Sequence, residues 1–332
     1  MSVATAQRTR SRVGWGDLLW LTWRQHRWTL GLTAFGVLAV IGHMAWIHTR
    51  ATDVIAMCGG GCSRADVAAA SELTPLISAS QSDLMVPLVL GVVIGVFWAA
   101  PLLSREFEQR THLVAWSQDL TAVRWLVGKV VLLAAAAVVL SVAMGATSAN
   151  LITHLNSVGF QIYNPYSESP FGSAPLVQAG YALFGFALGL AFSALTRRTV
   201  LSTGLTLTTF VVVREVVARW VRPHYLTPVH SFEPWSTPGK PYVPQVPPDG
   251  LRVDSGYADA AGNRMDVPAA CMNQAGDYQR CVTEHGVAGH YVFYHPAERV
   301  FSFQVIEFAL FTALALALFG FTWFRVRRPR RV

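Results

Sequence analysis

The residues best suited to specific chemistry lie in one short polar segment, 103–120. It combines charges of both signs, from Arg105, Glu106, Glu108 and Arg110, with the aromatic side chain of Phe107. Paired arginines and glutamates fix the register of a protein contact, and an aromatic anchor fills a groove in the partner. The segment is therefore suited to docking on another protein. A solvated helical extension without a partner fits the same composition equally well.

Motifs for ATP hydrolysis or proteolysis do not occur in the chain. The phosphate-binding pattern G-x-x-x-x-G-K-[ST] is absent, because the pairs Gly128-Lys129 and Gly239-Lys240 lack the earlier glycine and the following hydroxyl. Neither H-E-x-x-H nor G-x-S-x-G is found. We therefore expect a non-catalytic chain that carries no cofactor, and only scattered histidines and acidic residues favour the alternative of an intramembrane enzyme.

A few ionisable residues fall near the ends of apolar stretches. Arg214, Glu215 and Glu307 all lie toward one side of these stretches, and His43 lies within another. A charge at the centre of a bilayer costs ~2.5–3.5 kcal/mol, and the cost falls near the interface. We expect Arg214, Glu215 and Glu307 to form an ion-pair layer in the outer leaflet. A proton relay would need such groups at several depths, which disfavours a proton-coupled carrier.

The four cysteines, Cys58, Cys62, Cys271 and Cys281, suggest disulfides in an oxidising compartment. Three connectivities are open: each pair can close a local ring, or the pairs can cross-link two loops in either of two ways. Four free thiols are the further alternative. A zinc site is less favoured, because the two pairs do not repeat a ligand spacing.

Composition sets the frame for these residues. Hydrophobic residues make up 52% of the 332 residues and charged residues only 14%, against roughly 25% in soluble domains. This excludes a soluble enzyme and a disordered chain. Six stretches are long enough to cross a bilayer, which takes about 20 residues. They are 28–47, 84–103, 126–147, 174–195, 199–217 and 303–324. The sequence thus predicts an all-α integral membrane protein with six transmembrane helices, surrounded by lipid and without a nucleic-acid partner.

Arginines predict the orientation of the six helices. They cluster in the arm 1–27, in the loop 104–125, in the turn Arg197-Arg198 and in the basic tail 325–332. These four segments alternate along the chain in the way that places them all on the cytoplasmic side. Both termini are then cytoplasmic, and all four cysteines fall on the opposite side. The expected location is a bacterial plasma membrane.

The arm and the longest loop have their own character. Residues 15–27 carry tryptophan and arginine in a pattern typical of an interfacial amphipathic helix, although a simple charge anchor for the first span is the alternative. The loop 218–302, between the spans 28–217 and the last span 303–324, is proline-rich and has the composition of a small extracytoplasmic domain. His285, His290 and His295 within it share no helix or strand face, which disfavours a metal site.

Two small-residue motifs lie inside the predicted spans. Gly91 and Gly95 form one G-x-x-x-G pattern, and Gly185 and Gly189 form another. Small residues at this spacing let two helices approach closely. Packing within one subunit and contact between two subunits are equally compatible with the pattern.

Specific residues resemble those of one family. The run Arg105-Glu106-Phe107-Glu108, followed by Thr111 and by Lys129 at the next span, resembles the type 2 permease family of ATP-binding-cassette (ABC) exporters, particularly the multi-pass subunits common in actinobacteria. A second similar pattern comprises Pro296, Arg299, Gln304 and Glu307.

This resemblance implies a pore-forming permease subunit that exports a hydrophobic or amphipathic substrate. Residues Arg105, Glu106, Phe107, Glu108, Arg110 and Thr111 would then couple the spans to a separate cytoplasmic ABC ATPase subunit, which binds the ATP and magnesium. A second permease subunit, identical or different, would complete the pathway. The alternative is a membrane sensor or cell-envelope assembly protein that acts through its extracytoplasmic loop.

Overall fold

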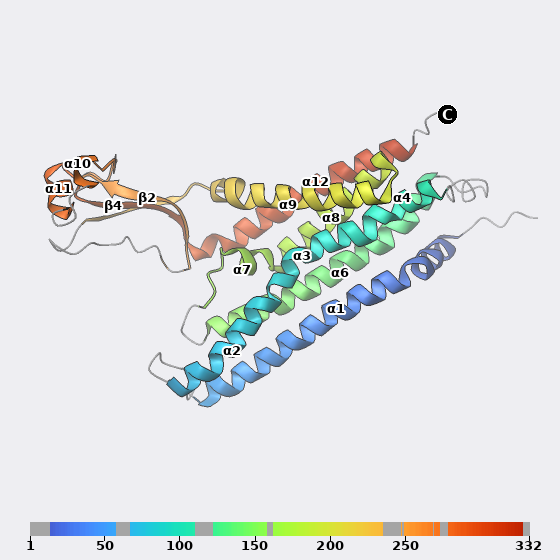
Figure 1. Cartoon of the computed structure of the whole chain (residues 1–332), viewed down its shortest axis with the longest axis horizontal. Helices are drawn as coiled ribbons and strands as arrows, with labels where there is room; N and C mark the ends of the chain where they lie inside the picture. Colours follow the sequence, from blue (N-terminus) through green and yellow to red (C-terminus); the bar gives the residue numbers. More distant parts are fainter. Residues whose placement is uncertain are drawn as a thin grey trace, which may run out of the picture.

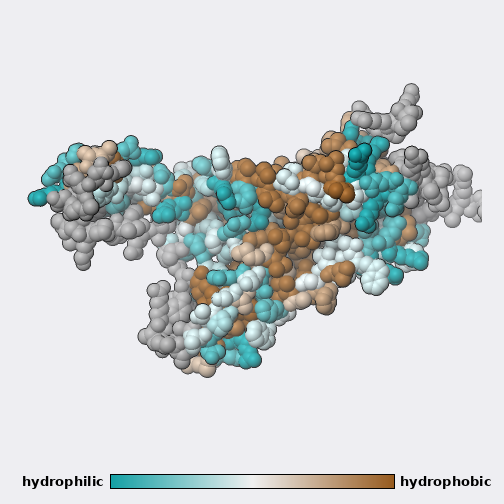
Figure 2. Space-filling view, viewed as in Figure 1, coloured by the Kyte–Doolittle hydropathy of each residue, from teal (hydrophilic) through white to brown (hydrophobic). Residues whose placement is uncertain are grey.

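The computed structural model describes residues 14–57, 67–109, 122–157, 162–234, 247, 249–267, 269–272 and 278–327. Within these ranges six segments are long and apolar enough to cross a membrane. They are Trp15–Met57, Ser71–Glu108, Arg124–Asn156, Pro175–Thr196, Thr199–His224 and Ala297–Arg327. The prediction of six apolar segments long enough to cross a membrane is confirmed. Figure 2 shows hydrophobic side chains gathered across the middle of the bundle, with hydrophilic ones toward its ends.

Five of the six segments consist mainly of one long helix each. These helices are α1 (Trp15–Met57), α6 (Ala122–Asn156), α8 (Pro175–Thr196), α9 (Thr199–Val216) and α12 (Val300–Arg327). The second segment is assembled from α2 (Val67–Asp83), α3 (Met85–Ile94), a π-helical turn at Gly95–Ala99 and α4 (Ala100–Glu108). A π-helical turn, Val217–Val221, and a 3₁₀ turn, Arg222–His224, extend α9. The short helix α7 (Glu168–Gly172) precedes α8.

Helix α8 lies at the centre of the bundle, and α1 lies at its rim. Most residues of α8 are buried, against α12, α6, α9 and the α3–α4 segment. By contrast α1 contacts mainly α6 and α2. It packs through a narrow stripe of residues seven apart, Leu30, Val37, Met44 and Ala51. Most of the α1 surface is therefore left for the surrounding lipid.

The two glycine motifs pack against each other within one chain. A Cβ atom added to Gly185 would meet the carbonyl oxygen of Gly91, and one added to Gly189 would meet that of Gly95, both well inside 3.0 Å. The backbones of α3 and α8 are therefore in direct contact. Of the two interpretations of these motifs, the structure supports packing within one subunit.

We expect Gly185→Val to destabilise the protein by about 1–3 kcal/mol, the usual cost of overpacking a core. The new side chain has no space, because backbone atoms rather than flexible side chains lie against this position. The thermal unfolding midpoint of the purified protein in detergent measures the effect. Gly204→Val on α9 is the matched control, since nothing lies within 4 Å of a Cβ atom there. Equal midpoints for the two variants would contradict the packing.

Helix α1 differs from the sequence-based expectation of a separate interfacial helix at 15–27. It is one continuous helix of 43 residues, because no proline or other strong helix breaker separates residue 15 from the apolar stretch. At about 1.5 Å per residue, such a helix exceeds the ~30 Å of the bilayer core. Its far end packs with α2 and the end of α6 through buried Ile47, Val54, Leu73 and Leu155. Together, these helix ends form a lobe at the end of the bundle that lies away from α4 and the C-terminus (Figure 1).

The expectation of an all-α chain is wrong for the loop 218–302. This region contains a four-stranded antiparallel sheet in the order β1-β4-β2-β3. The strands are β1 (Val229–Pro234), β2 (Leu251–Ala258), β3 (Arg264–Met265) and β4 (Gly289–His295), and two short helices, α10 (Ala269–Met272) and α11 (Tyr278–Glu284), accompany them. The central strand β4 is rich in aromatic and β-branched residues, whereas Pro234 lies on the edge strand β1, where proline is tolerated.

Candidate functional site

The end of α4 is joined to α6 by a buried ion pair. The ammonium group of Lys129 on α6 contacts the carboxylate of Glu106 on α4, and it lies 4.8 Å from the ring centroid of Trp125. The Lys129 side chain is only 5% exposed and that of Glu106 is 19% exposed. A buried ammonium needs such a counter-charge. Glu106 therefore fastens α4 to α6 inside the protein.

Glu108, two residues later, caps a different helix. Its carboxylate accepts a hydrogen bond from the backbone N–H of Thr199 at 2.8 Å and another from the Thr199 hydroxyl at 2.9 Å. Thr199 is the first residue of α9, where backbone N–H groups lack partners within the helix. A carboxylate at this position also interacts favourably with the helix dipole. Glu108 thus caps the N-terminus of α9. Arg198, the residue just before α9, makes no capping hydrogen bond with its side chain.

Two further contacts join α4 to Arg197 in the turn after α8 and to the first residue of α9. The guanidinium of Arg197 lies 5.2 Å from the ring centroid of Phe107, a cation–π distance. Arg197 adopts φ of 55°, a left-handed conformation that ends α8. The hydroxyl of Ser104 hydrogen bonds to that of Thr199 at 3.1 Å. We call the set Ser104, Glu106, Phe107, Glu108, Lys129, Arg197 and Thr199 the α4 junction.

The α4 junction changes the interpretation of the polar segment. Glu106 and Glu108, both predicted to contact a partner protein, have partners within the chain. Arg105 is exposed. Arg110 and Thr111 lie outside the described residues, as do Cys58 and Cys62. Sequence reasoning identified Lys129 but missed Thr199 and Arg197, because a contact between distant loops leaves no spacing pattern.

A second buried cluster lies at the opposite end of the bundle. Glu307 on α12 accepts hydrogen bonds from Arg222 at 2.8 and 2.9 Å, from the hydroxyl of Tyr181 at 2.5 Å and from that of Tyr225 at 3.1 Å. The Arg222 guanidinium also lies 4.0 Å from the ring centroid of Phe171. The side chains of Glu307 and Arg222 are 1% and 7% exposed. This cluster joins the extension of α9 to α12 and α8.

Arg214, Glu215 and Glu307, which were expected to form ion pairs in one layer, each pair with another residue. Arg214 pairs with Glu168 of α7 at 2.9 Å and donates to the carbonyl oxygen of Leu88 at 3.0 Å. Glu215 pairs with Arg219 one turn away, at 2.8 Å and near the surface. Thus Arg214, Glu215 and Glu307 do not pair with one another. Arg222 was not identified from the sequence as the partner of Glu307. Arg222 lies just beyond the end of the predicted stretch 199–217 and directly before Pro223.

The sheet domain contains a disulfide between Cys271 and Cys281, which joins α10 to α11. His285 lies near both sulfur atoms, but disulfide sulfurs are not the thiolates that bind metal ions. His290 packs against Tyr257, and the buried His295 donates to the carbonyl oxygen of Pro223 at 3.1 Å. Burial lowers the pKa of His295 and keeps its ring neutral. The three histidines do not converge.

Labelling of these cysteines tests the orientation. In a Cys58→Ser/Cys62→Ser background, a membrane-impermeant maleimide should label Cys271 and Cys281 on intact cells only after reduction. A further Arg327→Cys substitution at the other end of the chain should react only after lysis. Labelling of Cys271 that requires lysis would reverse the predicted topology.

Comparison with known proteins adds one finding. A family model described as ABC-2 membrane transporter related matches residues 29–222. No curated protein and no solved structure matches the chain. The matched range contains all residues of the α4 junction and ends at Arg222, so the sheet domain lies beyond it.

Proposed function

The chain belongs to the ABC-2 membrane transporter related family, and from this membership we propose that it is the transmembrane permease subunit of an ATP-driven exporter. A separate ABC ATPase subunit docks at the arginine-rich end, on the cytoplasmic side, and it binds the ATP and magnesium. A second permease subunit, identical or different, completes the pathway. The substrate is hydrophobic or amphipathic.

The α4 junction is the observation that carries this proposal. Segment 110–121 begins directly after α4 and ends where α6 begins. Just before its N-terminal end, Glu106 forms an ion pair with α6, and Glu108 accepts a hydrogen bond from the first residue of α9. A displacement of the segment by a docked ATPase is therefore transmitted to α4, α6 and α9 together. Packed side chains, ion pairs and hydrogen bonds of this kind can carry coupling between a docking site and distant helices.

The α3–α4 segment provides the element that such a movement would rearrange. The π-helical turn Gly95–Ala99 interrupts it and packs against α8 and α9. π-Helical turns inside α-helices are frequently found at functional sites. The Glu307 cluster fixes the other ends of α9 and α12, so these helices would pivot about it rather than separate.

Purification of the full chain from its native membrane tests the proposal. An ATPase with a phosphate-binding loop should co-purify, and the complex should hydrolyse ATP faster than the ATPase alone. Trp116→Ala, in the segment after α4, should weaken co-purification and leave membrane insertion unchanged. If the chain performs its function when purified alone, the proposal fails. If deletion of the sheet domain abolishes function while Trp116→Ala has no effect, the sensor alternative is favoured.

A further inference from the structure

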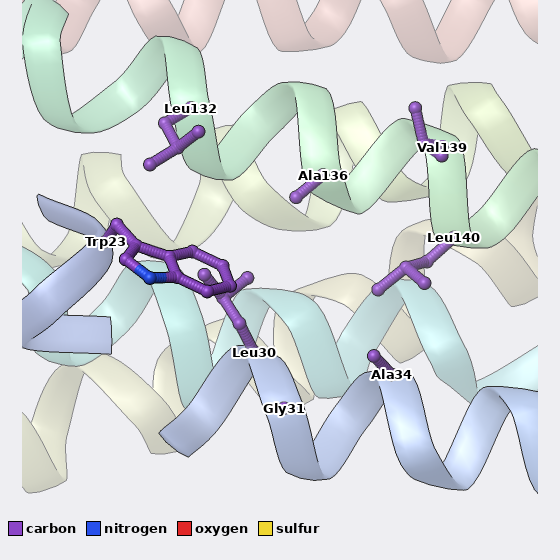
Figure 3. Close-up of a pocket in the computed structure, with 8 residues that line it drawn as sticks. All are labelled: Trp23, Leu30, Gly31, Ala34, Leu132, Ala136, Val139 and Leu140. Atoms are coloured by element: carbon purple, nitrogen blue, oxygen red, sulfur yellow. The ribbon is translucent and has the colours of Figure 1, made fainter. Parts of the chain in front are cut away.

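A groove runs between the exposed helix α1 and α6. Its lining comprises Trp23, Leu30, Gly31, Ala34, Leu132, Ala136, Val139 and Leu140, and its volume is about 250 Å³. Figure 3 shows these side chains along the space between the two helices, with Trp23 beside Leu132 at one end. Residues 132–140 extend over roughly 12 Å of helix. The lining carries no charged side chain, so the groove is suited to hydrocarbon.

A second hollow adjoins the first and has a different character. It is lined by Arg27, Trp28, Gly31 and Leu32, so that Gly31 borders both hollows. Its volume is about 430 Å³. Arg24 lies one turn before Trp28, and its guanidinium lies over the ring of Trp20. In the part of the chain that the structure describes, neither Arg24 nor Arg27 forms an ion pair with a carboxylate.

We propose that the two hollows together bind one anionic phospholipid of the leaflet at the arginine-rich end. Its acyl chain lies in the apolar groove between α1 and α6, and its phosphate lies beside Arg27. Tryptophans are typical of the headgroup level of a membrane, and a basic side chain near the surface attracts an anionic headgroup. The proposal is independent of the ATPase, because it concerns a face of α1 and α6 and not the α4 junction.

A second protein chain is the competing occupant of this groove. The charge distribution favours the lipid, because Arg27 lines the adjoining hollow without an acidic partner among the described residues, and Arg24 lies about one turn before it on α1. Acyl chains also conform to a shallow groove, whereas a helix needs a broad complementary face. The large exposed side chains Trp28, Leu32 and Phe35, which are more than 70% exposed, are suited to surrounding lipid.

Lipid binding to the full chain in detergent tests the proposal. Phosphatidylglycerol and phosphatidylcholine with the same brominated acyl chains are titrated, and tryptophan quenching and native mass spectrometry report binding. Phosphatidylglycerol should bind at least fivefold more tightly. Arg27→Gln should reduce this preference about fivefold, the effect of one cation near an anionic lipid. Arg327→Gln at the end of α12 is the matched control and should leave the preference unchanged.

Substitutions in the groove test the acyl-chain position. Ala136→Leu should lower binding of both lipids at least fivefold, whereas Ala317→Leu, at an exposed position of α12 away from the groove, should not. Equal affinity for the two lipids, or an Ala136→Leu variant that binds normally, would overturn the proposal. A groove covered by a second copy would also overturn it: the protein would then purify as a dimer that excludes the lipid, and Ala136→Leu would yield monomers.

Discussion

Glu106→Lys is expected to destabilise the protein by about 3–5 kcal/mol and to abolish ATPase-driven transport. The substitution places two cations at a buried position, and it leaves the 5%-exposed Lys129 without its carboxylate. The thermal unfolding midpoint and stimulated ATP hydrolysis by the reconstituted complex measure the two effects. The exchange Glu106→Lys/Lys129→Glu restores one opposite-charge pair, so it should recover most of the lost stability.

The double variant separates two roles for Glu106. If Glu106 acts through Lys129, the exchange recovers ATPase stimulation along with stability. If Glu106 instead contacts the ATPase directly, stability returns and stimulation does not. Arg105→Glu provides the matched comparison, because Arg105 lies on the exposed side of the same helix. We expect this variant to fold normally and to lose only the interaction with the ATPase. A Glu106→Lys protein as stable as the parent chain would contradict the buried pair.

The membrane architecture could be predicted because hydropathy acts over windows of about 20 residues. Each of the six apolar stretches is long enough to be recognised alone, and each falls to within one residue inside one of the six apolar helical segments of the structure. Helices α8 and α9 begin and end within one residue of the expected stretches 174–195 and 199–217, but the far end of α1 could not be predicted. Helix α1 continues to Met57 because its outer turns pack on α2 and α6, and hydropathy records the bilayer but not such a contact.

The charged residues were identified correctly as unusual, but their partners were not. Glu106 and Lys129 are 23 positions apart, and Glu108 and Thr199 are 91 apart. Pairing at such separations depends on how helices assemble, which a single sequence does not record. The sheet in 218–302 was missed for a related reason. The edge strand β1 ends in a proline-rich stretch whose composition favours loops, and the other edge strand, β3, has only two residues.

Glu307→Gln is expected to destabilise the protein by about 3–5 kcal/mol, although glutamine has nearly the same shape. The substitution leaves the Arg222 guanidinium, which is 7% exposed, without a counter-charge, and it weakens two tyrosine hydrogen bonds that end on the carboxylate. The unfolding midpoint in detergent measures the loss. Glu215→Gln is the matched control. It breaks the near-surface pair with Arg219, which should cost under about 0.5 kcal/mol.

Removal of both charges distinguishes a buried ion pair from a general intolerance of this position. Arg222→Met/Glu307→Leu eliminates the unpaired charge that makes each single variant unstable, so it should be more stable than Glu307→Gln. A double variant less stable than Glu307→Gln would mean that packing and the hydrogen bonds from Tyr181 and Tyr225, and not the ion pair, dominate at this position. If the double variant is stable but inactive in transport, then the ion pair serves the movement of α9 against α12 rather than the fold. That result is expected of a transporter that switches between two arrangements. Such a protein would keep a buried ion pair for its movement even though apolar residues at the same positions would allow it to fold equally well.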